Sequence, residues 1–221
     1  MPDITVACVL RSGGIYTPEW VDRLQRGVAE HLSLPHRFVC LSDMDVGCAR
    51  IPLQTSWPGW WAKIELFQPG LFRGTVLYLD LDVIVTGSLD AIASHEHTFT
   101  MAHDYYRPHH KCSTAMAWRG EDKHGIYERF DSAPALFQRS YRWQQGRGIL
   151  GDQAFIEDVL TRRREKIDTF SELFGERSIA SYKVHRCHSK PPAEAAVVAF
   201  HGKPKPSDII DGWVAEAWSR S

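Results

Sequence analysis

Short apolar runs alternate with amphipathic segments along the chain. Residues 4–10 are apolar and rich in β-branched side chains, and Ser12-Gly13-Gly14 follows them, which predicts a strand ending in a tight loop. Thr17-Pro18 precedes apolar positions that recur at helical spacing, and this pair favours a helix start. Residues 37–41 predict a second strand. A strand, a helix and a strand in this order are typical of a parallel sheet covered by helices.

The same alternation continues along the rest of the chain, without a repeat or a low-complexity segment. We therefore expect one α/β domain with a mostly parallel central sheet. Further strands are expected at 76–85, 98–103, 112–118, 179–184 and 195–200, and helices at 60–67, 151–160 and 209–218.

Composition fits an ordinary globular domain. The chain has 221 residues, 43% of them hydrophobic and 24% charged, with a formal net charge of −1. A net charge this close to zero does not favour binding to nucleic acid or to an anionic membrane, so we expect neither as a partner. Arg162-Arg163-Arg164 is the densest basic run, and we interpret it as a solvated face at the end of a helix.

Cysteine usage favours a reducing compartment. The number of cysteines is odd and no C-x-x-C occurs, which favours buried, reduced thiols in a cytoplasmic protein over a disulfide framework. No apolar run approaches 18 residues, and no basic segment followed by an apolar run opens the sequence, so we expect neither a membrane span nor a signal peptide. The cysteines are Cys8, Cys40, Cys48, Cys112 and Cys187.

Two aspartates, Asp80 and Asp82, lie inside the apolar run 76–85. Ionised carboxylates are rarely buried unless they are paired or bound to a cation, because losing their hydration costs on the order of several kcal/mol. In an extended chain, side chains two apart point the same way, so both carboxylates can face one point. Such a pair suits Mg²⁺ or Mn²⁺ shared with substrate phosphates. The alternative is a pair of strand-exposed aspartates bonded to backbone amides.

The segment 200–206 supplies further candidate ligands directly after a predicted strand. His201 can provide a nitrogen ligand, Gly202 permits close backbone approach, and Lys203 and Lys205 offer positive charge to phosphates. Together with the two aspartates it makes a candidate metal site next to a basic loop for a diphosphate. The alternative is a solvated, proline-rich connection.

Other candidate residues are individually less specific. Ser12 and Gly13 lie where a ligand approaches the end of a parallel strand, and Tyr16 could stack on a flat base. Lys63 precedes the aspartate strand and is more often solvent-facing at such a position, while Asp152 starts a helix and could be its N-cap.

In combination these segments resemble a known family, the nucleotide-sugar glycosyltransferases of the GT-A fold, and most closely family 8, which includes glycogenin and bacterial galactosyltransferases. Residues 9–16 resemble its first strand and nucleotide loop. Trp61-Ala62-Lys63 resembles its basic segment, with Lys63 lying 17 positions before Asp80. Residues 76–83, followed by Gly87-Ser88-Leu89, resemble its D-x-D strand.

The later part of the chain matches this family less closely. Gly151-Asp152-Gln153 matches the Asp-Gln pair near the donor sugar. Residues 112–116 stand where the family has Asn-Ser/Ala-Gly, which is a departure in the sugar-contacting region. Residues 201–206 resemble the His-x-x-Gly-x-x-Lys-Pro-Trp element in a compressed form that lacks the Trp.

The resemblance implies a Rossmann-like GT-A domain over 1–221, with a nucleotide-binding half at 1–90 and a half for the donor sugar and acceptor at 91–221, closed by the loop 200–206. It implies retaining transfer from a nucleoside-diphosphate sugar, with UDP favoured, to a glycan, protein or small-molecule acceptor. Mn²⁺ or Mg²⁺ would be held by Asp80, Asp82 and His201. The implied nucleotide-binding residues are Leu10, Ser12, Gly13, Tyr16, Asp80, Leu81, Gly202, Lys203 and Lys205, and the implied catalytic or donor-orienting residues are Lys63, Asp104, Asp152 and Gln153.

Two alternatives stay open from the sequence. A haloacid-dehalogenase-like phosphatase also uses D-x-D, with Asp80 as nucleophile, but its nucleophile normally ends the first core strand, whereas 79 residues precede Asp80 here. A non-catalytic sugar-nucleotide-binding protein is the second alternative. The tryptophans at 57, 60 and 61 would suit contact with an acceptor or packing in the core.

Overall fold

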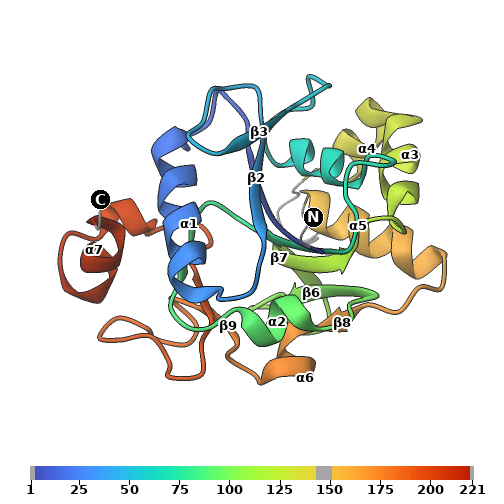
Figure 1. The fold of residues 1–221 in the computed structure, drawn as a ribbon. Helices are drawn as coiled ribbons and strands as arrows, with labels where there is room; N and C mark the ends of the chain where they lie inside the picture. Colours follow the sequence, from blue (N-terminus) through green and yellow to red (C-terminus); the bar gives the residue numbers. More distant parts are fainter. Residues whose placement is uncertain (1–2, 143–150, 220–221) are drawn as a thin grey trace.

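The structure is a computed structural model that describes residues 3–142 and 151–219. Its main element is a seven-stranded sheet with the order β3-β2-β1-β4-β7-β6-β8 (Figure 1). Every neighbouring pair is parallel except those of β7, which runs antiparallel to β4 and β6. The strands are β1 (Ile4–Leu10), β2 (Arg37–Ser42), β3 (Ala49–Pro52), β4 (Thr75–Leu79), β6 (Phe99–His103), β7 (Lys111–Arg119) and β8 (Asp168–Thr169).

A second sheet of three short strands has the order β5-β10-β9. Its strands are β5 (Val83–Val85), β10 (Val197–Ala199) and β9 (Ile179–Ser181). β10 pairs antiparallel with β5 and parallel with β9. Since β5 follows β4 after three residues, the chain passes directly from the large sheet to the small one.

Helices cover both faces of the large sheet. In Figure 1, α1 (Pro18–His31) lies on one side, and the 3₁₀ helix η1 (Gly59–Phe67) lies with α3, α4 and α5 on the other. The latter three are α3 (His124–Asp131), α4 (Pro134–Ser140) and α5 (Gly151–Arg162). The last helix, α7 (Gly212–Ser219), packs on the small sheet through Val214. Short helices complete the fold: α2 (Asp90–Ser94), α6 (Phe170–Phe174) and η2 (Pro206–Asp208).

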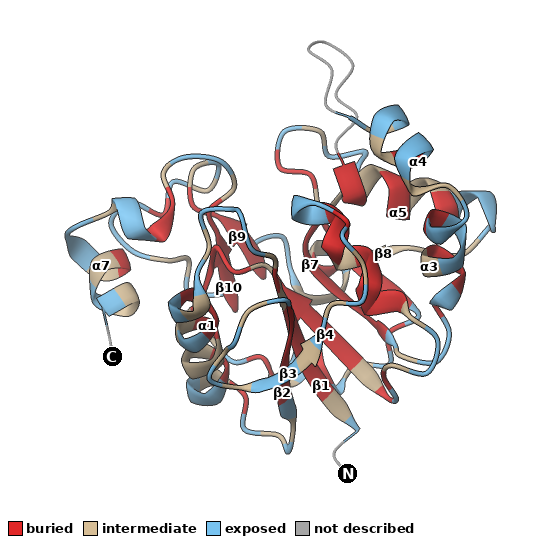
Figure 2. Ribbon diagram, turned by 90° about the horizontal axis from the view of Figure 1, so that it is seen from above, coloured by how far each residue is buried: buried red, intermediate tan, exposed pale blue. Residues whose placement is uncertain are grey.

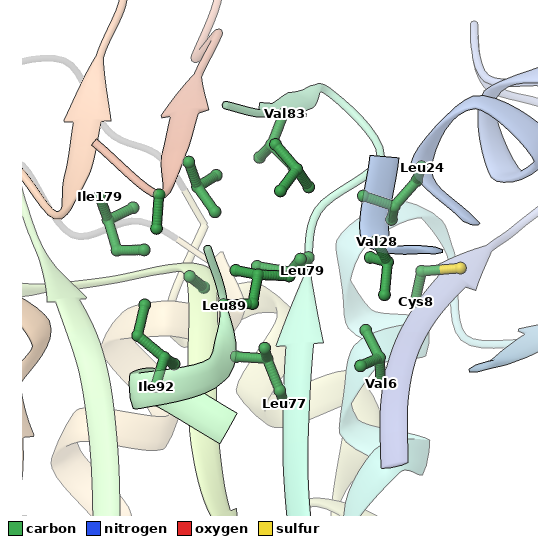
Figure 3. Packing of buried hydrophobic residues seen from close by; sticks show 14 of the residues in the cluster. Val6, Cys8, Leu24, Val28, Leu77, Leu79, Val83, Leu89, Ile92 and Ile179 are labelled. Atoms are coloured by element: carbon green, nitrogen blue, oxygen red, sulfur yellow. The ribbon is translucent and has the colours of Figure 1, made fainter. Parts of the chain in front are cut away.

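Alternation along the central strands directs side chains into two cores, and the strands are buried almost throughout (Figure 2). Leu77 and Leu79 of β4 join the core beneath α1, whereas Val76 and Tyr78 join the core beneath η1, α3 and α5. Figure 3 shows the first core, where Val83 and other residues of the small sheet pack with residues of β1, β4 and α1. The two sheets therefore share one hydrophobic core.

The predicted α/β class and mostly parallel sheet are confirmed, as are the strands at 98–103 and 112–118 and the helix start at Thr17-Pro18. The single strand predicted at 76–85 is wrong, because the chain leaves β4 after Leu79 and re-enters a strand at Val83 in the other sheet. The strand predicted at 179–184 ends at Ser181, where a turn closed by His185 N–H to Ser181 O begins. Among the described residues, no helix combines the length and apolar character needed to cross a bilayer.

Candidate active site

Two adjoining cavities open at the carboxyl ends of β1 and β4. The larger has a volume of about 670 Å³ and the smaller about 350 Å³. This edge of a parallel sheet is where ligands bind in open α/β folds. Both cavities are lined by Tyr16, Trp60, Lys63, Asp80 and Asp82.

The loop after β1 forms one wall of the larger cavity. Ser12 and Gly13 line it, and Gly13 has a φ of +86°, which favours glycine. The Ser12 backbone N–H and hydroxyl donate to the carboxylate of Asp43 at 2.9 and 2.6 Å, so the loop is fixed to the end of β2. Leu81 also lines this cavity, whereas the side chain of Leu10 is fully buried in the core and does not.

Tyr16 is placed between the loop after β1 and the aspartates. Its hydroxyl donates to Asp82 Oδ2 at 3.0 Å, and its ring meets Trp20 edge-on at 4.9 Å between centroids. Burial, and then the negative charge of Asp82, raise the pKa of the phenol, so it stays a proton donor. Its stacking on a base stays a prediction.

The two aspartates are anchored to different sheets. The backbone N–H of Asp80 donates to Thr114 O of β7 at 2.9 Å, and the backbone carbonyl of Asp82 accepts from Phe200 N at 3.0 Å. These bonds extend the β4–β7 and β5–β10 ladders into the turn. The predicted convergence of the two side chains on one cavity is therefore found, but a turn between two sheets produces it rather than a continuous strand.

Lys63 is a buried cation between two carboxylates. Its Nζ lies 2.9 Å from Asp80 Oδ1 and 3.3 Å from Asp152 Oδ2. Burial lowers the pKa of Lys63, but the carboxylates of Asp152 and Asp80 outweigh it and the net shift is upward, so the ammonium stays charged. The solvent-facing alternative is excluded for this lysine, whose side chain is 12% exposed.

Asp152 lies within the first turn of α5, and its carboxylate is turned toward the cavity. It accepts from the hydroxyl of Ser113 at 2.7 Å, and Ser113 in turn accepts from Lys63 at 3.1 Å. Burial raises the pKa of Asp152, and the charge of Lys63 opposes this shift. Gln153 lines the same cavity. Ser113, which stands in the segment that departs from the family pattern, was not predicted as a site residue.

Of the two lysines in 200–206, only Lys205 reaches the site. Its ammonium pairs with Asp82 Oδ2 and donates to Phe200 O, the latter at 3.2 Å. Burial, and then the charge of Asp80, raise the pKa of Asp82, while Lys205 lowers it. Lys203 instead pairs with Asp208 at 2.9 Å, with a side chain that is 75% exposed. Gly202 lines the smaller cavity.

His201 also lines the smaller cavity, from the turn after β10. Its Nε2 lies 2.6 Å from Ser181 Oγ, and its ring stacks on Tyr105 at 5.1 Å. Burial, and then the charge of Lys183, lower the pKa of His201 to about 4. The imidazole is therefore neutral near pH 7, the form that binds metals. Lys183 beside it was not anticipated, because nothing in its sequence context sets it apart.

The donor set of Asp80, Asp82 and His201 suits a hard divalent cation, because two carboxylates and a neutral imidazole are oxygen and nitrogen ligands for Mn²⁺ or Mg²⁺. All three line the smaller cavity. Within residues 3–142 and 151–219, however, no three His, Cys, Asp or Glu side chains lie close enough together to form a metal-binding group. The metal site stays a prediction.

Asp104 is not brought to either cavity. Its carboxylate accepts from the backbone N–H groups of Tyr106 and Arg107 at 2.9 and 3.0 Å, and it pairs with the Arg107 guanidinium at 2.8 Å. In this structure the side chain therefore holds a turn after β6.

Comparison with known proteins gives structural but no sequence matches. No protein-family model matches the chain, and a search of curated proteins finds no match. Two crystal structures of the glycosyltransferase GlyE from Streptococcus pneumoniae TIGR4, one in the apo form, align over 97% of the chain at 14% identity, with TM-scores of 0.62 and 0.64. The chain spans only 58 to 59% of GlyE. The galactosyltransferase LgtC, in complex with donor and acceptor sugar analogs, aligns over 97% of this chain and 93% of its own at 13% identity, with a TM-score of 0.59. The chain therefore has the GT-A fold of these glycosyltransferases, as the sequence resemblance predicts.

Proposed function

We propose that the protein is a metal-dependent glycosyltransferase that moves a sugar from a nucleoside-diphosphate sugar to an acceptor. The observation that carries the proposal is the meeting of Asp80, Asp82, Lys63, Lys205 and Asp152 at the two cavities of a GT-A fold. Isolated carboxylates and ammonium groups are costly to bury, so this concentration of them at a ligand-binding edge is typical of a functional site.

The larger cavity would hold the nucleoside. Its volume of about 670 Å³ falls in the usual range for small-molecule sites, and glycine backbone and Tyr16 form part of its wall. Uracil is the base we propose, because the family resemblance favours UDP. Lys205 lines the smaller cavity, where it pairs with Asp82, and would contact the diphosphate as a compact positive charge.

Asp80, Asp82 and His201 would hold Mn²⁺ or Mg²⁺, and this ion, when bound, supplies positive charge against the negative charge that develops on the leaving diphosphate. Lys63 keeps its proton and fixes the orientation of Asp80 and Asp152. Gln153 would contact the donor sugar. The resemblance supports retention of configuration, with the leaving phosphate helping to deprotonate the acceptor.

The setting we propose for the reaction is the cytoplasm. Cys8, Cys40, Cys48, Cys112 and Cys187 are all unpaired, which supports a cytoplasmic location. The phosphatase alternative is not retained, because the fold is that of glycosyltransferases and Asp80 is held by Lys63 and by the hydroxyl of Tyr78, at 2.5 Å. Sugar-nucleotide binding without turnover is the competing outcome of the test below.

The test is a thermal-shift screen of UDP-glucose, UDP-galactose and GDP-mannose, with Mn²⁺ and with chelator. A donor at a hundredfold excess over its Kd stabilises by about 2.7 kcal/mol, which raises Tm by roughly 5 to 10 °C for a chain of this size. We expect the shift only with Mn²⁺, and slow donor hydrolysis by the same sample.

Asp80→Asn and Asp82→Asn should each remove the metal-dependent part of the shift and the hydrolysis, whereas Asp45→Asn, at a fully exposed side chain, should keep both. Transfer that survives in the first two variants contradicts the assignment. A shift without any turnover supports the non-catalytic alternative.

A further inference from the structure

Three tryptophans within five positions lie in different surroundings. Trp57 and Trp61 are 7% and 5% exposed and pack on Phe130, with centroid distances of 4.7 and 4.8 Å. They belong to the core between η1 and α3. Trp60 is 52% exposed. The core-packing interpretation of the sequence is therefore right for two of the three and wrong for Trp60.

Trp60 lies at the junction of the two cavities and lines both. Its indole rests against the backbone at the start of α5, where a Cβ on Gly151 would come within 2.5 Å of the indole Nε1. Gly151 also has a φ of +47°, so glycine is favoured there twice over. This contact places the indole next to Asp152 and Gln153.

The contact with Gly151 covers only part of the indole. Among the described residues, Trp60 stacks on no other ring, and more than half of its surface faces the cavities and solvent. Apolar surface stabilises a protein only when it is covered, and an exposed aromatic side chain in a cleft is typical of a ligand contact.

We propose that Trp60 is the stacking platform for the sugar ring of a neutral carbohydrate acceptor, an inference that rests on the proposed transferase function. A pyranose ring has one face of C–H groups and a rim of hydroxyls, so it can cover the indole while its hydroxyls contact polar neighbours such as Gln153. Trp60 lines the smaller cavity as well as the larger one, together with the start of α5, where the donor sugar is expected. This position favours a role beyond contact with the base.

The charge of the cavity selects against an anionic acceptor. Its lining carries three carboxylates and two ammonium groups, from Asp80, Asp82, Asp152, Lys63 and Lys205. The metal ion proposed to bind with the diphosphate largely offsets the negative charge of that group, so the excess of carboxylates over ammonium groups in the lining remains. A neutral sugar approaches without like-charge repulsion.

The experiment compares the full chain with Trp60→Ala, Trp60→Phe and Ile210→Ala. Ile210 is 92% exposed and lines neither cavity, so its variant controls for loss of an exposed apolar side chain. The probes are methyl hexopyranosides and neutral disaccharides, added with UDP and Mn²⁺ and followed by saturation-transfer NMR. With UDP-sugar present, UDP release gives the acceptor KM, and release without acceptor gives donor hydrolysis.

We expect ring C–H saturation of at least one pyranoside with the unmodified chain and with Ile210→Ala. Trp60→Ala should raise the acceptor Kd and KM about tenfold, and Trp60→Phe should stay within about threefold. Affinity for UDP and donor hydrolysis should stay unchanged in Ile210→Ala, and in Trp60→Ala both should fall by clearly less than the acceptor affinity does.

An unchanged pyranoside affinity in Trp60→Ala overturns the inference while leaving the transferase proposal intact. A loss of UDP affinity as large as the loss of acceptor affinity assigns Trp60 to the base instead. If the unmodified chain binds no nucleotide and hydrolyses no donor, the proposed function fails and this inference fails with it.

Discussion

Glu65 is a buried carboxylate that carries a sharp stability prediction. It is 0% exposed within η1, and four hydrogen bonds satisfy it. Oε1 accepts from the backbone N–H and the hydroxyl of Thr55 at 3.0 and 2.5 Å, and Oε2 accepts from Gln54 N and Gln68 Nε2 at 2.6 and 2.8 Å. The side chain thus ties the segment before η1 to the helix that carries Lys63.

Glu65→Gln keeps the shape of this side chain but replaces one accepting oxygen by an NH₂ group. In either orientation the new amide N–H groups face one backbone N–H, so that bond is lost, and the remaining bonds lose the negative charge that strengthens them. The Thr55 hydroxyl or the Gln68 amide must also turn from donor to acceptor. Hydrogen bonds to charged groups contribute about 1.5–3 kcal/mol each, so we expect a loss of about 3–5 kcal/mol. That is a large part of a typical folding stability of about 5–15 kcal/mol.

Urea unfolding followed by tryptophan fluorescence measures this change. With an m-value of about 3 kcal/mol/M, the urea midpoint should fall by about 1–1.7 M. Glu128→Gln, the same substitution at an exposed position of α3, should stay within about 0.5 kcal/mol of the unmodified protein. If the two variants are equally stable, the carboxylate of Glu65 does not hold η1 as the hydrogen bonds indicate.

Two further predictions address the loop 200–206 and acid stability. Lys205→Met should weaken Mn²⁺-dependent UDP binding about tenfold in calorimetry while Lys203→Met changes it less than about twofold, because only Lys205 reaches the cavity. Equal losses in the two variants would contradict this assignment. Burial lowers the pKa of His97 from about 6.5 to about 4, and a hydrogen bond to Ile92 O opposes this shift. Between these two pH values the folded state binds fewer protons than the unfolded chain. The free energy of unfolding should therefore fall by about 3 kcal/mol as the pH drops through this interval. Unfolding free energies measured between pH 7 and 4 should show this loss, and the free energy of His97→Gln should fall less over the same range. An equal pH dependence in the two proteins would refute the assignment to His97.

The sequence pattern predicts those helices and strands that depend on neighbouring residues alone. The helix at Pro18 and the strands 98–103 and 112–118 follow from periodicity and turn residues, and all are found. The prediction of a single strand at 76–85 is wrong because the residues on both sides of the aspartates are apolar, and composition does not indicate which sheet each strand joins. That choice depends on Thr114 and Phe200, which are distant in sequence and bond the two ends of the turn.

The candidate site divides in the same way. Lys63, Asp152 and His201, which the family resemblance implies as site residues, all line the smaller cavity. The resemblance could not choose between Lys203 and Lys205, because that choice depends on the Asp208 carboxylate, which captures Lys203. The misplacement of Asp104 has a similar cause, since its carboxylate is used by the backbone of the turn that follows it.

The passage of the chain between the two sheets is what assembles the candidate site. The backbone of Asp80 remains hydrogen-bonded to β7. The same strand carries Ser113, whose hydroxyl is hydrogen-bonded to both Lys63 and Asp152. Asp82 has crossed to the small sheet, where Val83 pairs with Ala199 and the next residues of that strand lead into His201 and Lys205. A continuous strand would keep both aspartates on the large sheet and away from β10. Two sequence-distant halves of the site therefore meet because the chain leaves β4 between Leu79 and Val83, and this break places each carboxylate beside its own lysine.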